Sequence, residues 1–211
     1  MGGTRLWAAV LAVLVAVAAV ALRGSGAAGA PPPPPGLTTI RAYLNDLQVA
    51  APHSMDGYSR EKFPHWIDQG NSCDTRETVL KRDGTGVKVG SDCYPTAGRW
   101  YSVYDATWLS DPSDVQIDHI VPLADAWRSG ADTWTTSKRQ DYANDLEDSQ
   151  LIAVSGSSNE AKGDQDPSAW KPSNRSDWCA YAEDWIDVKH VWGLTVTSTE
   201  KSALSSMLGS C

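Results

Sequence analysis

The chain of 211 residues is long enough for one domain of ordinary size together with a targeting segment. Its formal net charge is −8 at pH 7, which excludes binding of polyanions through a global positive field. Any contact with nucleic acid therefore needs a local basic patch or a metal ion.

An apolar run opens the chain. Residues 6–22 are rich in Ala, Val and Leu, Arg5 precedes them, and the small residues "GSGAAGA" follow. This layout predicts a secretory signal peptide over residues 1–30 and leaves the cleavage site open: Pro31 makes the bond after Ala30 a poor site, so cleavage a few residues earlier is an alternative. An uncleaved membrane anchor is the alternative, since the run is near the lower limit for a spanning helix. With cleavage we expect a secreted, extracellular protein without stable membrane association.

A run of five prolines follows the leader and predicts an extended, stiff spacer over 31–36 ahead of a single domain over 37–211. Apolar periodicity and turn residues then predict an α+β fold. We expect helices over 38–50, 122–130, 136–146, 157–164, 177–194 and 197–211, strands over 115–121 and 150–156, two short strands within 87–110, and a helix or strand over 74–84.

Four cysteines in an exported chain predict two disulfides. The residues are Cys73, Cys93, Cys179 and Cys211, and three pairings are possible. We favour Cys73–Cys93 with Cys179–Cys211, because this choice keeps both loops local. No pair has the C-x-x-C spacing of a cysteine zinc site.

The stretch "DVQIDHIVPL" places two ionisable groups, Asp118 and His119, at the end of a predicted buried strand. Neighbouring strand residues point to opposite faces, so the two side chains have separate surroundings. A second strand and a helix follow, and that helix carries Asn159. The oxygens of Asp118 and Asn159 are hard ligands suited to Mg²⁺ or Mn²⁺, and His119 is then placed to take a proton from an attacking water.

"DHIVPL", "QLIAV" and "SSNEAKGD" together resemble the HNH nuclease motif, a ββα-metal finger. The chain is more specifically similar to secreted HNH-family endonucleases, which are related to the C-terminal nuclease domain of GmrSD-type restriction enzymes. The motif covers residues 114–166, and "FPHW", "CDTRETVLKRDG" and "WIDVKHVWGL" extend the likeness. The resemblance implies a ββα-metal core wrapped by helices, with disulfides in place of the zinc ribbon that many HNH proteins carry.

The resemblance also implies residue roles: Asp118 and Asn159 as metal ligands, His119 as general base, and Lys162 near the scissile phosphate. The Asn that braces the His loop in the family has no clear match. By position Gln150 takes its place, with Asn144 and Asp148 as alternatives.

Two residues beside a cysteine complete the expected site. Arg76 is our candidate for a phosphate contact, since a planar guanidinium suits a phosphate. Glu77 is a candidate for orienting a partner or approaching the metal. Among the remaining histidines, His65 in "FPHW" is the one expected to pack near the site.

The sequence therefore predicts a secreted, metal-dependent, monomeric endonuclease that hydrolyses DNA with little sequence specificity and has RNA as an open second substrate. The family resemblance implies that hydrolysis leaves a 5′-phosphate. The alternative is a non-catalytic secreted protein that binds cell-wall glycan on a degenerate nuclease scaffold. Ten Trp residues support that alternative, because aromatic faces bind sugars. It predicts a row of exposed Trp and no metal dependence.

Overall fold

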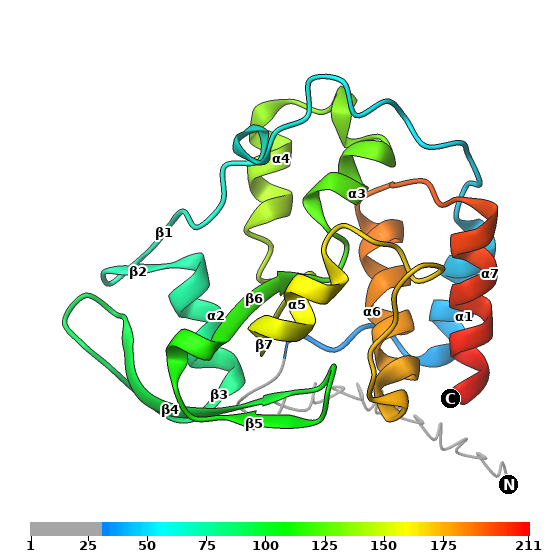
Figure 1. Cartoon of the computed structure of the whole chain (residues 1–211). Coiled ribbons are helices and arrows are strands. Elements are labelled where there is room, and N and C mark those ends of the chain that lie inside the picture. Colours follow the sequence, from blue (N-terminus) through cyan, green and yellow to red (C-terminus); the bar gives the residue numbers. More distant parts are fainter. Residues whose placement is uncertain (1–30) are drawn as a thin grey trace, which may run out of the picture.

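The computed structural model describes residues 31–211, so the predicted signal peptide lies outside the described residues. A two-stranded hairpin occupies the middle of the molecule (Figure 1). A three-stranded sheet lies below it in this view, α3 and α4 lie above it, and α1, α6 and α7 stand together beside it. None of the helices between residues 31 and 211 is long and apolar enough to cross a membrane.

The elements follow one another in mixed order, as expected for an α+β fold. The helices are α1 (Leu37–Asp46), α2 (Thr75–Asp83), α3 (Leu123–Arg128), α4 (Thr136–Ala143), α5 (Gly156–Lys162), α6 (Trp178–Val191) and α7 (Ser198–Met207). The strands are β1 (Asp68–Gly70), β2 (Cys73–Asp74), β3 (Gly84–Val89), β4 (Pro95–Ser102), β5 (Thr107–Leu109), β6 (Val115–His119) and β7 (Leu151–Ser155).

The central hairpin and the helix after it form the ββα unit that carries the site. β6 and β7 pair antiparallel, with Asp118 opposite Ile152 and His119 opposite Leu151. The chain then enters α5 directly, because the Ser155 hydroxyl accepts the Ser158 N–H and caps the helix. The predicted strand–strand–helix order is therefore present, although some 30 residues containing α3 and α4 separate the two strands.

Both faces of the hairpin are buried, which explains why its strands read as apolar on both sides. One face, which includes Ile117 and Leu151, packs with α2 and with Trp100 of β4. The other face, which includes Ile152 and Val154, packs into the larger core shared with α1, α6 and α7. Two cores thus meet at the strands, and residues next to each other in β6 enter different environments.

The region from 74 to 110 differs in part from its prediction. The ambiguous segment 74–84 is the helix α2, and its capping box of Asp74 and Glu77 fixes the start. Three strands, not two, follow, because residues from Gly84 onward pair with β4. Trp100 lies so close to Gly84 that an added Cβ would come within 2.6 Å of the indole nitrogen, so only glycine fits there.

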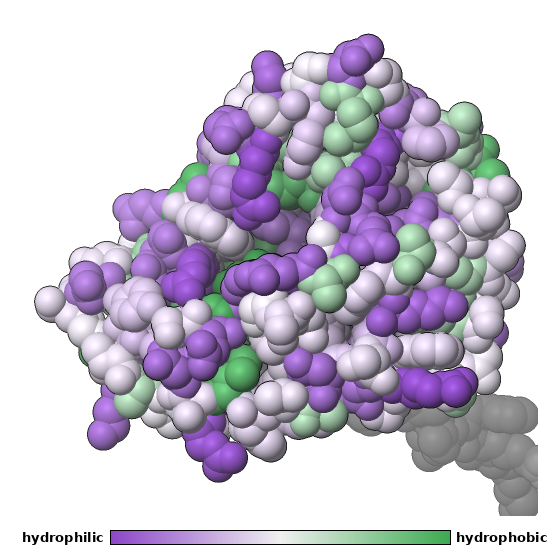
Figure 2. Space-filling model, in the orientation of Figure 1, coloured by the Kyte–Doolittle hydropathy of each residue, from purple (hydrophilic) through white to green (hydrophobic). Residues whose placement is uncertain are grey.

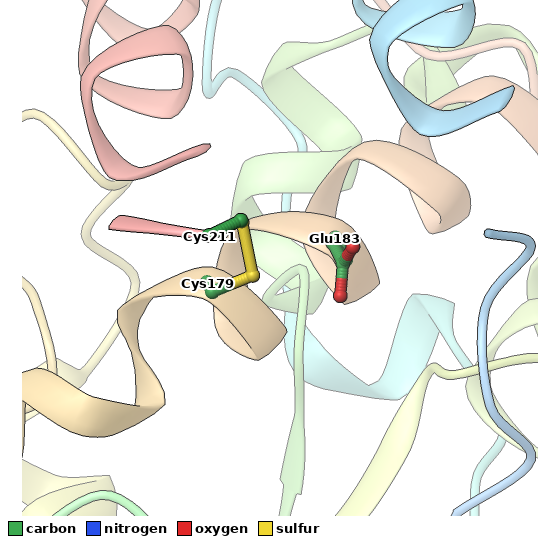
Figure 3. Close-up of side chains that lie close together, drawn as sticks. All are labelled: Cys179, Glu183 and Cys211. Carbon is green, nitrogen blue, oxygen red and sulfur yellow. A yellow bond between two sulfur atoms is a disulfide. The ribbon is translucent and has the colours of Figure 1, made fainter. Parts of the chain in front are cut away.

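Two disulfides brace the domain, and both have the local pairing that the sequence favoured. Cys73–Cys93 ties β2 to the turn before β4, and Cys179–Cys211 ties the last residue to α6. The second bond is drawn in Figure 3, where Glu183 lies beside it. A terminus that would otherwise fray is therefore attached to a core helix.

Candidate active site

Asp118 is held by a buried ion pair. Its side chain lies on the face of β6 that enters the larger core, and the residue is 4% exposed. Lys162 Nζ lies 2.9 Å from Oδ1 and also donates to the His119 carbonyl, while the Tyr104 hydroxyl donates to Oδ2 at 2.6 Å. Burial raises the pKa of Asp118 and lowers that of Lys162, and their mutual attraction opposes both shifts. The carboxylate is thus fixed in orientation.

His119 lies on the other face and is held differently. Its Nε2 is 3.0 Å from the Ala143 carbonyl oxygen, and the Trp66 ring stacks on it with centroids 5.5 Å apart. A carbonyl oxygen only accepts, so Nε2 carries the hydrogen and Nδ1 is left as the acceptor. Burial lowers the pKa of His119 to about 3. The imidazole is therefore neutral near pH 7 and offers a lone pair at Nδ1.

Asn159 approaches from α5 with its amide orientation set by a neighbour. Its Nδ2 donates to Gln116 Oε1 at 2.8 Å, and Gln116 Nε2 donates in turn to Glu160 at 3.1 Å. Because the amide nitrogen is used in this chain of bonds, Oδ1 is the atom left to bind a ligand.

Asp118, His119 and Asn159 all line one cavity of about 210 Å³. The face in Figure 2 is hollowed near its centre, above α5 as placed in Figure 1. The wall also contains Arg60 and Asp164, and Asp164 is paired with Arg128 at 2.5 Å. Among the described residues, Arg60 is the only Lys or Arg that lines this cavity, so it supplies the positive charge opposite the acidic residues of the wall.

Arg60 was missed by the sequence reasoning. It belongs to "YSREKFPHW", and its Nε donates to His65 Nε2 at 3.2 Å, while His65 Nδ1 donates to the Phe63 carbonyl at 2.8 Å. His65 thus lies near the site as expected, where it positions Arg60. "FPHW" had pointed to this segment, but nothing in its local pattern marked Arg60.

The end of α4 fastens this segment to the same place as His119. Asn144 Nδ2 donates to the Pro64 carbonyl at 2.8 Å and its Oδ1 accepts the Ile67 N–H, while Arg139 donates to the Lys62 carbonyl. The neighbouring Ala143 supplies the carbonyl that holds His119. One helix end therefore positions both the imidazole and the segment that covers it.

Gln150 braces the turn that follows His119. Its side chain accepts the Val121 N–H at 3.2 Å and donates to the Val121 carbonyl at 3.0 Å, and its backbone carbonyl accepts the Ile120 N–H. Of the two alternatives, Asn144 holds the 64–67 segment instead. Asp148 lines a different cavity.

Three predicted residues do not reach the cavity wall. Arg76 bonds the Val115 carbonyl at 3.4 Å and lies over the Tyr94 ring, and Glu77 caps α2. Lys162 is fully buried beneath Asp118. The geometry therefore brings together Asp118, His119 and Asn159, and the cationic residue on the cavity wall is Arg60 in place of Arg76 and Lys162.

The donor set suits a hard divalent cation. Asp118 offers about four lone-pair positions, of which Lys162 and Tyr104 take up to three, and Asn159 adds an amide oxygen. A different cluster, Cys179, Glu183 and Cys211, brings its atoms within 4.8 Å of one another. Its two sulfurs form the disulfide in Figure 3, so no thiolate is available there to hold a metal.

Comparison with known proteins identifies a relative and a family for this chain. An "Uncharacterized secreted protein" of Arthroderma benhamiae is 57% identical over 175 residues, which cover 82% of this chain and 85% of that protein. Its name agrees with the predicted extracellular location, and this chain is a secreted protein. No solved structure matches. The family model of the C-terminal domain of GmrSD restriction endonucleases matches residues 75–207, more than half of the chain. The chain therefore belongs to the family of GmrSD restriction endonuclease C-terminal domains.

Proposed function

We propose that the protein is an extracellular, metal-dependent endonuclease that hydrolyses phosphodiester bonds of DNA, and that RNA is a second substrate. The observation that carries the proposal is the convergence of Asp118, His119, Asn159 and Arg60 on one cavity. An acid, an amide oxygen, a neutral imidazole and a guanidinium together match the needs of phosphodiester hydrolysis.

His119 acts as the general base. The bond from Nε2 to the Ala143 carbonyl keeps the proton on that nitrogen, so Nδ1 accepts the proton of the attacking water. Although the pKa is about 3 in the protein alone, a phosphodiester anion beside the ring favours the imidazolium. The Ala143 carbonyl stabilises the same charged form.

Asp118 and Asn159 hold the divalent cation, Mg²⁺ or Mn²⁺. The cation, when bound, supplies Lewis-acid stabilisation of the phosphate and of the leaving oxygen. Lys162 acts beneath Asp118 as a positioning residue, because its ammonium fixes both carboxylate oxygens and is buried away from the cavity. This role replaces the phosphate contact expected from the sequence.

Arg60 binds the substrate phosphate. Its side chain is exposed at the cavity wall, and the bond to His65 directs the guanidinium. A guanidinium forms two parallel bonds to a phosphate group and stabilises the charge that grows in the transition state. A local cation of this kind also explains how a chain with a net charge of −8 approaches a polyanion.

The first test is cleavage of supercoiled plasmid by the purified mature protein with Mg²⁺ or Mn²⁺. We expect nicking and linearisation that EDTA abolishes and that His119→Ala reduces by about 10²–10⁴-fold, the usual contribution of a general base. His53→Ala is the matched control, because His53 is exposed and pairs with Asp132 outside the cavity. If folded, disulfide-bonded protein cleaves no DNA with either metal, the proposal is wrong.

The glycan-binding alternative receives less support from the surface. Among the Trp residues between positions 31 and 211, Trp108 alone is exposed, beside Tyr101 and under Arg99. One exposed Trp is not the row of aromatic faces that a glycan-binding groove needs. Insensitivity of any measured activity to EDTA and to His119→Ala would favour this alternative.

A further inference from the structure

A second cavity lies on the far side of the hairpin from His119, between the strands and α6. Its volume is about 160 Å³, and Pro31, the first described residue, forms part of its wall. The lining is mainly apolar, from Val103, Tyr104, Ile120, Ile152 and Ala180. Three polar side chains of α6 and its N-terminus, Asp177, Tyr181 and Asp184, complete it.

The polar groups of this cavity are missing a cation. Among residues 31–211 neither Asp177 nor Asp184 forms an ion pair with a basic side chain. The Tyr181 hydroxyl is buried and has no hydrogen-bond partner within that range. The cations nearest to Asp177 in sequence, Lys171 and Arg175, lie over the Trp178 ring, and Lys189, the nearest to Asp184, pairs with Asp125 and Glu200.

Burial of these carboxyl groups is costly without a partner. It raises the pKa of Asp177 to about 7 and that of Asp184 well above its ordinary value, where a hydrogen bond with Ser149 opposes the shift and repulsion from Asp177 adds to it. A buried charge is tolerated when it is paired and hydrogen-bonded. The cavity is thus suited to a small apolar group that carries a positive charge.

The chain brings one such group to the cavity. The Ser149 hydroxyl donates to the Pro32 carbonyl at 3.0 Å, which holds the proline segment against the domain. Leader cleavage is expected a few residues before Pro31, within "GAAGA", and each residue spans at most about 3.6 Å. The new α-amino group therefore belongs to a Gly or Ala residue and is joined to Pro31 by at most four residues, a reach of at most about 14 Å.

We propose that this cavity binds the amino terminus of the mature chain, with its α-ammonium paired to Asp177 and Asp184 and donating to the Tyr181 hydroxyl. Removal of the leader then creates the cation that α6 lacks. The proposal is independent of the nuclease reaction, and activity is not its readout, because Tyr104 contributes both to this cavity and to the hydrogen bond on Asp118.

The test is the acidity of the α-amine in the secreted protein. After N-terminal sequencing, the amine is labelled with ¹³C by reductive methylation, which preserves its charge, and is titrated by NMR. An unperturbed α-amine has a pKa of about 7.7–8.0, and pairing with buried carboxylates is expected to make it at least tenfold less acidic.

Variants then locate the partner. Asp184→Asn and Asp177→Asn are expected to return the amine toward its ordinary acidity. Asp187→Asn is expected to leave it unchanged, because Asp187 is a buried carboxyl of the same helix that does not line this cavity. Ordinary acidity of the α-amine in the wild-type protein overturns the proposal without any variant, as does a secreted chain that retains residues 1–30.

Discussion

The two faces of the central hairpin hold their ionisable residues by different means. Asp118 is fixed by Lys162, which is the last residue of α5 and so belongs to the same ββα unit. His119 is fixed by Ala143 at the end of α4 and is covered by Trp66, which comes from a segment more than 50 residues earlier. The side of the proposed metal ligand Asp118 is thus built largely within the motif, whereas the side of the proposed base His119 is assembled from distant segments.

This difference shows what each side depends on. The Asp118 side depends on a buried charge pair, so its failure affects folding. The His119 side depends on backbone bonds from Asn144 and Arg139 that hold residues 62–67 in place, so its failure affects the geometry of catalysis. Each prediction below disturbs one side and measures whether the other responds.

The largest effect is expected on the Asp118 side. Lys162→Met leaves the carboxylate buried and unpaired, which is expected to lower the free energy of unfolding by about 3–5 kcal/mol. Denaturant unfolding measures the change. The double variant Asp118→Asn with Lys162→Met is expected to recover part of the loss, and Lys88→Met is the exposed control. A single variant as stable as the wild type would show that the pair is not a buried charge interaction.

Arg60 tests the His119 side without touching the core. Arg60→Ala is expected to lower kcat/KM for DNA cleavage by about 10²-fold, because it removes a charge that stabilises the transition state. Arg60→Lys is expected to retain part of the activity, and Arg76→Ala, which lies away from the cavity, to retain nearly all. Equal losses from Arg60→Ala and Arg76→Ala would contradict the assignment. Thermal unfolding checks that both variants remain folded.

An Asn144 variant tests whether the end of α4 positions both His119 and the segment that covers it. Asn144→Ala removes the bonds to Pro64 and Ile67 and a further one from Thr75, with an expected loss of about 1–3 kcal/mol of stability. DNA binding is expected to weaken, because the 64–67 segment carries His65, which directs Arg60, and activity is expected to fall further, because it also depends on the position of His119. Asp141→Ala, on the same helix and exposed, is the control. A change in affinity alone would place the role of Asn144 elsewhere.

The smallest expected effect is on the pH dependence of stability, where His119 and the buried carboxyl groups of Asp187 and Glu200 act in opposite directions. The folded pKa of His119, about 3, lies below the unfolded value, so its contribution is present above about pH 6.5 and is lost as the pH falls toward 3. Burial raises the pKa of Asp187 and Glu200 to about 6, so their contribution is present below about pH 4 and is lost as the pH rises through 6.

The consequence is measurable with one variant. His119→Gln removes the group whose protonation favours the unfolded chain at low pH. As the pH falls from 7 to 5, the free energy of unfolding of the variant is therefore expected to rise by about 1–2 kcal/mol relative to that of the wild type. Thermal unfolding at pH 5, 6 and 7 measures this difference. Asp187→Asn is expected to act in the opposite sense, by flattening the loss toward pH 7. Parallel curves for wild type and His119→Gln would mean that the imidazole is not buried.

Much of the site could be predicted from the sequence because it is local. The apolar runs around residues 117 and 152 fix two strands, and the Asp-His pair at the end of the first takes opposite faces through the alternation of strand side chains alone. Asn159 follows from its place in the helix after β7. The short cysteine loops are likewise local, and both predicted disulfides are present.

Only the tertiary structure decided which basic residues lie at the candidate site. Arg76, Lys162 and Arg60 look alike in sequence as basic residues near motif positions, yet the fold places Arg76 outside the cavity, Lys162 beneath Asp118 and Arg60 at the wall. The physical reason is that a charge acts through distance and burial, and both are set by contacts between segments far apart in the chain. The sequence determined the chemistry at the hairpin, and long-range packing decided which charges surround it.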